Sequence, residues 1–374
     1  MARKVGNLGE RQGTRATPSM QTSATNERYV MQSDSNVAVE DRPVTTPAAT
    51  RGRRKRHSYA RSVIARTVRL VATFLLVTFL SAAFLNLVPG DPAEFVAGDS
   101  ASPEVIHAVN QQYHFNDPLV VRYNHWLGGL LRGNLGESYL THQPVWRTMT
   151  QRLPITLELA ALAMLLSLAV AIPLAISLSR RPGSLLDRAF GAVSSAAISA
   201  PSFVVAILLI YFVSYRLGWL PVYGWTRLTA DPLENLRHVA LPVVSIALAE
   251  TVVLTRVLRA DLIETLQQDY IALARAKGLS PRRIMWKHAL RPSLTSMMTL
   301  AALQLARFLG GTVVIESVFA LPGLGTMALQ AISAKDLAVV QAVVAFVAIA
   351  FLLVNFAVDT LYGVLDPRTR VRHD

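Results

Sequence analysis

The chain returns again and again to apolar runs of about 20 residues, and this repetition most constrains how it can fold. The first run covers residues 70–88. As a helix, a run of that length crosses the hydrocarbon core of a bilayer. It exceeds the apolar stretch of a signal peptide, follows a long polar tail and precedes further runs. We therefore interpret it as a retained membrane span.

Five more runs follow along the chain, and proline interrupts one of them at Pro201. Their approximate ranges are 154–178, 189–215, 238–258, 293–315 and 337–361. Each is long enough to span a membrane as a helix. The pattern predicts an all-α membrane protein with six transmembrane helices.

Composition supports this fold class and narrows the function. Of the 374 residues, 52% are hydrophobic and only 16% are charged, which suits an integral membrane protein. The absence of cysteine excludes disulfides, cysteine-ligated zinc sites and a cysteine nucleophile.

The net charge of +13 would suggest nucleic acid as a partner if the protein were soluble. Here 14 of the 37 Lys and Arg residues precede Leu70, and 8 more lie between Arg256 and Arg291. Charge that alternates with apolar spans determines topology, so we expect membrane phospholipid and no nucleic acid as the partner of these residues.

The distribution of basic residues among the loops predicts the orientation. Loops 180–188 and 256–291 carry 3 and 8 Lys or Arg residues, whereas loops 216–237 and 317–336 carry 3 and 1. Because cytoplasmic loops are enriched in Lys and Arg, both termini are predicted to lie in the cytoplasm of a multi-pass protein of the cytoplasmic (inner) membrane.

Four regions follow from these patterns. Residues 1–58 are polar and are predicted to be a disordered cytoplasmic tail, which ends in the polybasic run 51–56. That run either contacts anionic lipid or only fixes the orientation of the first span. Residues 59–152 hold the first span and an external segment, 153–365 a core of five helices, and 366–374 a second cytoplasmic tail.

The longest polar break in the chain, within loop 261–291, carries its own stop and start signals. Helix-forming residues run up to Lys277, and Gly278 provides a position for a left-handed helix end. Ser280 and Pro281 then form an N-cap followed by proline at the first helical position. The break predicts two short helices joined by a tight glycine turn.

This loop resembles the EAA loop of ABC importer permeases, which docks into a cleft of the cytosolic ATPase. Ala274 and Gly278 match the alanine and glycine of that motif. Ala272 stands where the motif has an acidic residue, and His288 and Arg291 also depart from it. These departures are common in the peptide-importer branch of the family.

Four other stretches resemble the B-type permease of dipeptide, oligopeptide and nickel importers. They are residues 88–93, 133–138, 152–159 and 321–325. The resemblance covers about residues 69–370 and implies the type I ABC importer permease fold. It implies four kinds of partner: a second, C-type permease, two cytosolic ATPase subunits, an extracytoplasmic substrate-binding protein and the lipid membrane.

The resemblance also implies two sets of functional residues. The ATPase-coupling residues would be Tyr270, Ala274, Arg275, Ala276, Gly278 and Arg291. The second set would form an external gate turn at Pro322, Gly323 and Gly325.

No catalytic pattern is visible in the chain. The phosphate-binding pattern G-x-x-x-x-G-K-[ST], the zinc pattern H-E-x-x-H and the nucleophile elbow G-x-S-x-G are all missing from the sequence. We therefore expect no enzyme activity, catalytic residue or cofactor in this chain, and ATP hydrolysis on separate subunits. The external histidines His107, His114, His125 and His142 have no i, i+4 pair, so solvated surface is favoured over a metal site.

Two charges of opposite sign fall inside predicted spans at similar depth. Glu250 lies in the fourth span and Arg307 in the fifth. Because intramembrane charges are costly, we hypothesise a buried Glu250–Arg307 ion pair. The pair would either fix the packing of the two spans or contact the charged ends of a peptide.

The favoured function is that of a permease subunit in an ATP-driven importer of dipeptides or oligopeptides. The same architecture importing nickel or glutathione is an alternative, since the sequence does not identify the cargo. A self-sufficient secondary transporter is another, although no internal repeat typical of such carriers is evident.

Overall fold

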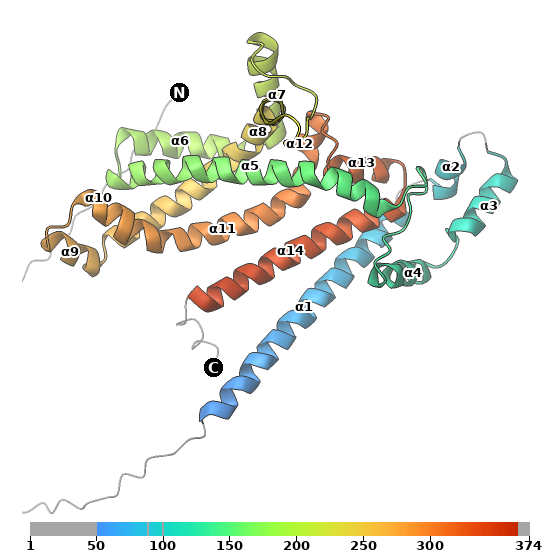
Figure 1. Ribbon diagram of the computed structural model, residues 1–374, viewed down its shortest axis with the longest axis horizontal. Coiled ribbons are helices and arrows are strands. Elements are labelled where there is room, and N and C mark those ends of the chain that lie inside the picture. The colour runs from blue at the N-terminus through green and yellow to red at the C-terminus, as the bar shows by residue number, and fades with distance from the viewer. Residues whose placement is uncertain (1–50, 88–89, 99–100, 366–374) are drawn as a thin grey trace, which may run out of the picture. The chain divides into compact units, whose positions relative to one another are not determined.

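The computed structural model describes residues 51–87, 90–98 and 101–365, and this part is helical without a β-strand (Figure 1). An isolated β-bridge joins Glu137 and Pro144. The chain divides into two units at His57 and Ser58, and the packing reported below is that of the second unit. The predicted disorder of residues 1–50 and the predicted tail 366–374 lie outside the described residues.

The first helix, α1, covers Arg51–Leu87 and begins inside the segment that the sequence assigned to a disordered tail. Within it, residues 67–84 form a stretch apolar enough to cross a membrane. This stretch agrees with the first predicted span to within a few residues.

The external segment folds into three helices, α2 (Pro92–Ala97), α3 (Pro103–Tyr113) and α4 (Leu119–Leu131). Proline at the first position starts α2 and α3, where its missing N–H costs nothing. The segment packs against α1 through Tyr123, whose hydroxyl bonds the Thr78 hydroxyl at 2.8 Å.

Four long helices form the body of the second unit: α5 (Val145–Arg180), α8 (Pro232–Leu266), α11 (Leu290–Gly311) and α14 (Leu337–Leu365). Helix α5 packs along α8, and α11 contacts both α8 and α14 (Figure 1). A core of fully buried side chains, including Leu254, Leu258 and Met297, joins α8 to α11.

Helix α5 begins nine residues before the predicted start at Pro154 and carries Pro154 and Pro173 in its interior. Helix α8 begins at Pro232 and carries Pro242 inside. The apolar run thus marks only the part of each helix that would lie in lipid, while the polar turns before it continue the same helix. Interior proline is tolerated in membrane helices because neighbouring groups satisfy the freed carbonyls.

By length and composition, α1, α5, α8 and α14 could each cross a membrane. The pair formed by α6 (Leu185–Ser199) and α7 (Ser202–Leu209), the latter continued by a π-helix to Arg216, passes the same test only when its two parts are taken together, as a broken span or a re-entrant loop. It is bent by 100° at the break around Pro201, where the sequence predicted an interruption. Helix α11 lies on the predicted fifth span but is not apolar enough to be counted. An all-helical membrane protein is confirmed, while six spans and the orientation of the termini stay predictions.

Candidate functional site

The predicted helix–glycine–helix is present in the loop between α8 and α11. Helix α9 covers Asp269–Ala276, and Gly278 follows it with φ 76°. The N–H of Leu279 donates to the Ala274 carbonyl at 3.2 Å, and that of Gly278 donates to the Arg275 carbonyl at 2.9 Å. These two bonds form a Schellman motif, in which a residue without Cβ takes the left-handed position at least cost.

The second short helix starts as its capping residues predict. The Ser280 hydroxyl accepts from the N–H of Arg283, and Pro281 is the first helical residue of α10 (Pro281–Arg283). A π-helical turn, Ile284–Ala289, then leads directly into α11. The loop is therefore rigidly connected to a long helix of the body.

A small apolar cluster holds the two short helices together. Ile271, Ala274 and Ile284 are buried and pack with Leu266 and Leu279. Because Ala274 is only 7% exposed, it supports the loop from inside and does not present a surface to a partner. Among the alanines of α9, Ala272 and Ala276 are exposed, whereas Ala274, which was predicted to be a coupling residue, is buried.

The other predicted coupling residues lie on the loop surface. Tyr270, Arg275, Ala276, Gly278 and Arg291 are all exposed. The Tyr270 hydroxyl donates to the His288 carbonyl at 3.4 Å, and Arg275 donates to the Leu266 carbonyl at 3.4 Å.

Two apolar side chains that sequence reasoning missed also stand out from the loop. Leu273 is 56% exposed and Trp286 is 50% exposed. Trp286 borders a groove of about 1350 Å³ between the end of α5 and the loop. The basic residues that line this groove are Arg180, Arg275 and Arg282. Because exposed apolar patches mark interaction sites, these side chains make the loop a candidate contact surface.

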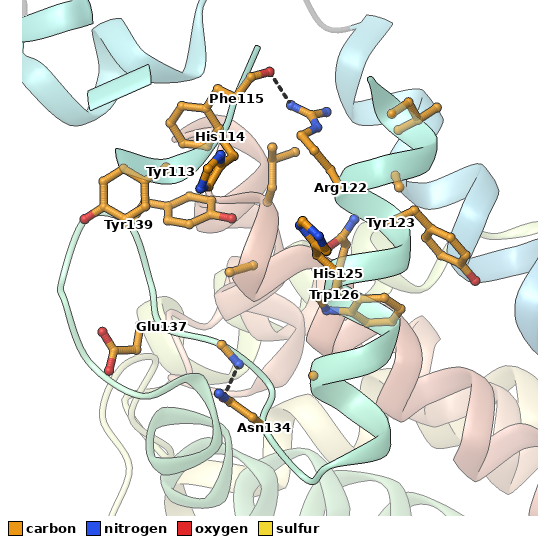
Figure 2. Close-up of a pocket in the computed structure, with 17 residues that line it drawn as sticks. Tyr113, His114, Phe115, Arg122, Tyr123, His125, Trp126, Asn134, Glu137 and Tyr139 are labelled. Carbon is orange, nitrogen blue, oxygen red and sulfur yellow. Dashed lines mark hydrogen bonds between the residues drawn. The ribbon is translucent and has the colours of Figure 1, made fainter. Parts of the chain in front are cut away.

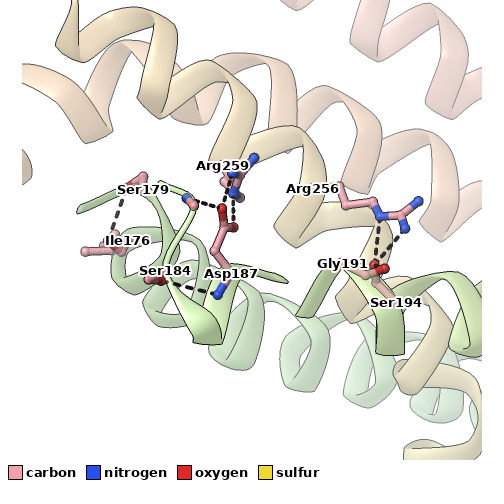
Figure 3. Close-up of polar contacts among 9 residues, drawn as sticks. Ile176, Ser179, Ser184, Asp187, Gly191, Ser194, Arg256 and Arg259 are labelled. Carbon is pink, nitrogen blue, oxygen red and sulfur yellow. Dashed lines mark hydrogen bonds and ion pairs between the residues drawn. The ribbon is translucent and has the colours of Figure 1, made fainter. Parts of the chain in front are cut away.

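Polar contacts fasten α6 to α8 near this loop (Figure 3). The Arg259 guanidinium forms a two-pronged ion pair with Asp187, with both N–O distances 2.6 Å. Further along, Arg256 donates to the Ser194 hydroxyl at 2.6 and 3.1 Å. Bidentate arginine–carboxylate pairing fixes orientation as well as distance, so α6 is held in one register on α8.

A buried carboxylate organises the predicted external gate turn between α12 (Val313–Val318) and α13 (Leu324–Ser333). Glu316 is fully buried. Its Oε1 accepts from the hydroxyls of Thr156 at 2.8 Å and Thr312 at 2.9 Å, and its Oε2 accepts from the Thr326 N–H at 3.0 Å. The carboxylate thus joins α5 to both ends of the turn.

The glycines of the turn are required by this carboxylate. A Cβ on Gly323 would collide with the carboxyl group of Glu316, and a Cβ on Gly325 would lie 2.6 Å from the Val313 Cα. Pro322, by contrast, is exposed at the tip. Sequence reasoning identified the turn but missed Glu316, although an acidic residue at the end of an apolar run was a usable signal.

The hypothesised direct ion pair between Glu250 and Arg307 is absent from the part of the chain that the structure describes, where every N–O distance between the two side chains exceeds 4.0 Å. Arg307 instead donates to the Oε1 of Gln304 on its own helix at 3.2 Å. The Glu250 Oε1 is buried without a hydrogen-bond partner. The sequence placed both charges on predicted spans but did not reveal the Gln304 contact of Arg307.

The external segment forms a pocket of about 290 Å³ against the start of α14 (Figure 2). Tyr113, Phe115 and Tyr139 make mutual ring contacts on one side. Arg122 donates to the Phe115 carbonyl at 3.0 Å on the other. Burial, with a smaller effect of the Asp336 charge, raises the pKa of Tyr139 to about 12, so this phenol stays neutral.

Two neighbouring buried charges join the external segment to the body. The Lys335 ammonium donates to the Gly90 carbonyl, and Asp336 accepts from the Ser138 hydroxyl at 2.5 Å. Gly90 and Ser138 belong to two of the stretches that carried the family resemblance.

The four histidines of this segment do not form a cluster. His114 and His125 line the pocket, while His142 contacts the Tyr113 hydroxyl at 3.4 Å. Among the described residues, no three His, Asp or Glu side chains lie close enough together to hold a metal ion.

Comparison with known proteins decides the family. Residues 171–371 match the family model of the inner membrane component of binding-protein-dependent transport systems. Residues 59–160 match the model of the N-terminal part of such membrane components. The chain belongs to this permease family. It is therefore a multi-pass inner-membrane protein, and the expected ABC importer permease of the peptide and nickel group is confirmed.

Curated relatives align over almost their whole length. A putative peptide transport system permease protein of Brucella abortus is 37% identical over 308 residues, covering 82% of this chain and 98% of its own. A di/tripeptide transport system permease protein of Pseudomonas aeruginosa is 37% identical, covering 83% and 98%. A glutathione transport system permease protein of Salmonella choleraesuis is 34% identical, covering 83% and 99%.

Among solved structures, the chain is similar to one of the MetNI methionine ABC transporter in inward-facing conformations. The TM-score is 0.48 at 18% identity, covering 60% of this chain and 99% of that one.

Proposed function

We propose that this chain is the B-type transmembrane subunit of an ATP-driven ABC importer that carries short peptides across the cytoplasmic membrane. The family assignment and the relatives named as peptide permeases support this cargo class. Hydrolysis of ATP then belongs to two cytosolic ATPase subunits. A C-type permease and a binding protein complete the transporter.

The observation that carries the proposal is the rigid loop formed by α9, the Gly278 turn and α10. Leu273 and Trp286 are apolar side chains that a soluble partner would cover, and Tyr270 is exposed as well. The π-helical turn after α10 connects the loop directly to α11. When nucleotide brings the ATPases together, the docked loop moves as a unit and tilts α11, which switches the bundle between its two states.

The external turn is the proposed gate at the opposite end of the bundle. Glu316 bonds Thr156 of α5 and the backbone of Thr326, so a shift of the turn relative to α5 has to break at least one of these bonds. In this mechanism Pro322, Gly323 and Gly325 shape the part of the turn that moves. The proposal further includes six spans with both termini in the cytoplasm.

Glutathione is a second candidate cargo, favoured by the Salmonella relative, and it is itself a tripeptide. A nickel cargo has weaker support, because the relatives named here are peptide or glutathione permeases. A secondary transport mechanism has weaker support too, because it would leave the capped loop without a role.

Copurification and ATPase activity test the proposal. The detergent-solubilised wild-type chain should retain an ATPase and a second permease. Gly278→Pro should lose the ATPase or uncouple it, because proline cannot adopt φ 76° and lacks the N–H that bonds the Arg275 carbonyl. Gly133→Pro is the matched control. Gly133 has φ 78°, open space around it and an N–H bonded at 2.9 Å, but it lies in the external segment.

ATPase binding should survive Gly133→Pro. A wild-type chain that purifies alone and transports in liposomes without ATP would contradict the proposal. Loss of the ATPase in both variants would assign the effect to general misfolding, and the loop would then have no special role in coupling.

A further inference from the structure

Helix α11 has two faces of different chemistry. Met297, Ala301 and Leu309 are buried and pack into the bundle. Ser296 and Arg307 lie on the other face and are exposed, with half-buried Thr299 and Leu303 between them. Ser296 and Thr299 are three residues apart and Thr299 and Arg307 are eight apart, spacings that place all three on the same side of an α-helix. This polar face explains why α11 is not counted among the apolar spans.

An exposed guanidinium on a membrane helix is costly in lipid, so it faces a water-filled path or another polar surface. Arg307 carries five N–H donors in a planar fork, and the structure gives them one acceptor, Gln304 Oε1 at 3.2 Å. Among the described residues no carboxylate lies within ion-pair distance of it. The fork is therefore open to an anionic ligand.

Glu250 provides an independent observation at the same place. Its side chain is 6% exposed, and its Oε1 is buried without a hydrogen-bond partner. Glu250 lies near enough to Arg307 for their charges to interact but beyond ion-pair distance, so it does not occupy the fork.

We propose that Arg307 receives the terminal carboxylate of a peptide in transit, on a water-lined face of α11 formed with Ser296 and Thr299. Guanidinium and carboxylate fit in a bidentate manner that neither an amide nor an ammonium provides. Glu250 and Gln304 are positioning residues. The inference rests on the proposed peptide-import function.

The placement of Glu250 also limits how tightly the ligand binds. A carboxylate arriving at Arg307 meets the residual negative charge of Glu250, which weakens its binding. Transport requires a site that is favourable enough to enter and weak enough to leave. A buried acid behind the arginine meets that requirement, whereas an isolated arginine would retain the peptide.

The first test uses the absence of cysteine, which makes any introduced thiol unique. Thr299→Cys in the assembled transporter should react with a charged, water-soluble methanethiosulfonate. Leu353→Cys, an exposed apolar position on α14, is the matched control and should remain unreactive. An unreactive Thr299→Cys would overturn the water-lined path.

The second measurement detects the electrostatic potential that Arg307 produces around itself. Gly311→Cys places a thiol one helical turn away, where an added Cβ meets no atom within 4 Å. The ratio of its reaction rates with an anionic and a cationic methanethiosulfonate should fall about tenfold on Arg307→Gln and rise on Glu250→Gln. A ratio unchanged by Arg307→Gln would overturn the anion site.

The third measurement identifies the ligand group. Peptides with a free or an amidated C-terminus are loaded onto the binding protein before mixing. Arg307→Gln should slow uptake of the free acid several-fold more than uptake of the amide. Equal slowing of both, or loss of the second permease on copurification, would make Arg307 a subunit contact and overturn the inference. Peptide uptake by wild type without ATP would instead contradict the proposed function.

Discussion

At the scale of single residues, Glu316 shows how a buried charge is made compatible with a membrane bundle. Each carboxylate oxygen has a donor, and the hydroxyls of Thr156 in α5 and of Thr312 between α11 and α12 supply part of the shell. Buried carboxylates persist where their hydrogen bonds are complete. Glu316 is therefore the main structural determinant of the external turn.

Glu316→Gln should destabilise the protein by roughly 1–3 kcal/mol. The amide can still accept from the threonines, but its NH₂ group then faces the Thr326 N–H, and two donors meet. The midpoint of thermal unfolding in detergent measures the effect. Glu234→Gln, at a half-exposed residue of the first turn of α8, is the control and should change the midpoint little. Equal midpoints for the two variants would contradict the role of Glu316.

Gly323→Ala should lower the yield of folded protein far more than Gly311→Ala. The added methyl group at Gly323 would overlap the Glu316 carboxyl group, whereas at Gly311 it meets open space. Size-exclusion profiles of the two variants provide the comparison. If Gly323→Ala behaves like Gly311→Ala, the turn can shift away from the carboxylate and is less tightly built than the contacts indicate.

At the scale of elements, some structural features follow from local sequence signals and others follow from long-range contacts. The Gly278 turn and the Ser280 cap were predictable because a Schellman motif and an N-cap depend on neighbours in sequence. The attachment of α6 to α8 was not, since Asp187 and Arg259 are separated by 72 residues. Their pairing is a property of the packed helices.

Asp187→Asn should destabilise the contact between α6 and α8 by roughly 1–2 kcal/mol, because a charge-assisted bidentate pair becomes a single neutral contact. The charge swap Asp187→Arg with Arg259→Asp should recover part of the loss. The readout is again the unfolding midpoint. Asp231→Asn is the control, since asparagine caps α8 as well as aspartate does. A swap no more stable than either single variant would contradict direct pairing.

At the scale of the whole molecule, the orientation of the bundle is open to a direct test. With no cysteine in the chain, Ser102→Cys and Lys277→Cys each carry one thiol on an exposed residue. A membrane-impermeant maleimide added to spheroplasts should label Ser102→Cys only, because the basic loop is retained in the cytoplasm. Both should be labelled after permeabilisation. Labelling of Lys277→Cys from outside would invert the predicted topology.

The sequence by itself determined the structural features that depend on apolar runs and on residues adjacent in the chain. Apolar runs of membrane length identified the helices, Pro201 identified the bend, and capping residues identified the loop. The motifs of the loop and of the external turn pointed to the permease family, which the comparisons confirmed.

Only the tertiary structure decided which polar groups meet. It paired Arg307 with Gln304, buried Ala274 inside the loop, and brought Thr156 to Glu316 across 160 residues. Depth in a membrane follows from counting residues along a helix, but the rotation of each helix about its axis follows from packing against its neighbours. For this reason sequence reasoning located the intramembrane charges and could not assign their partners.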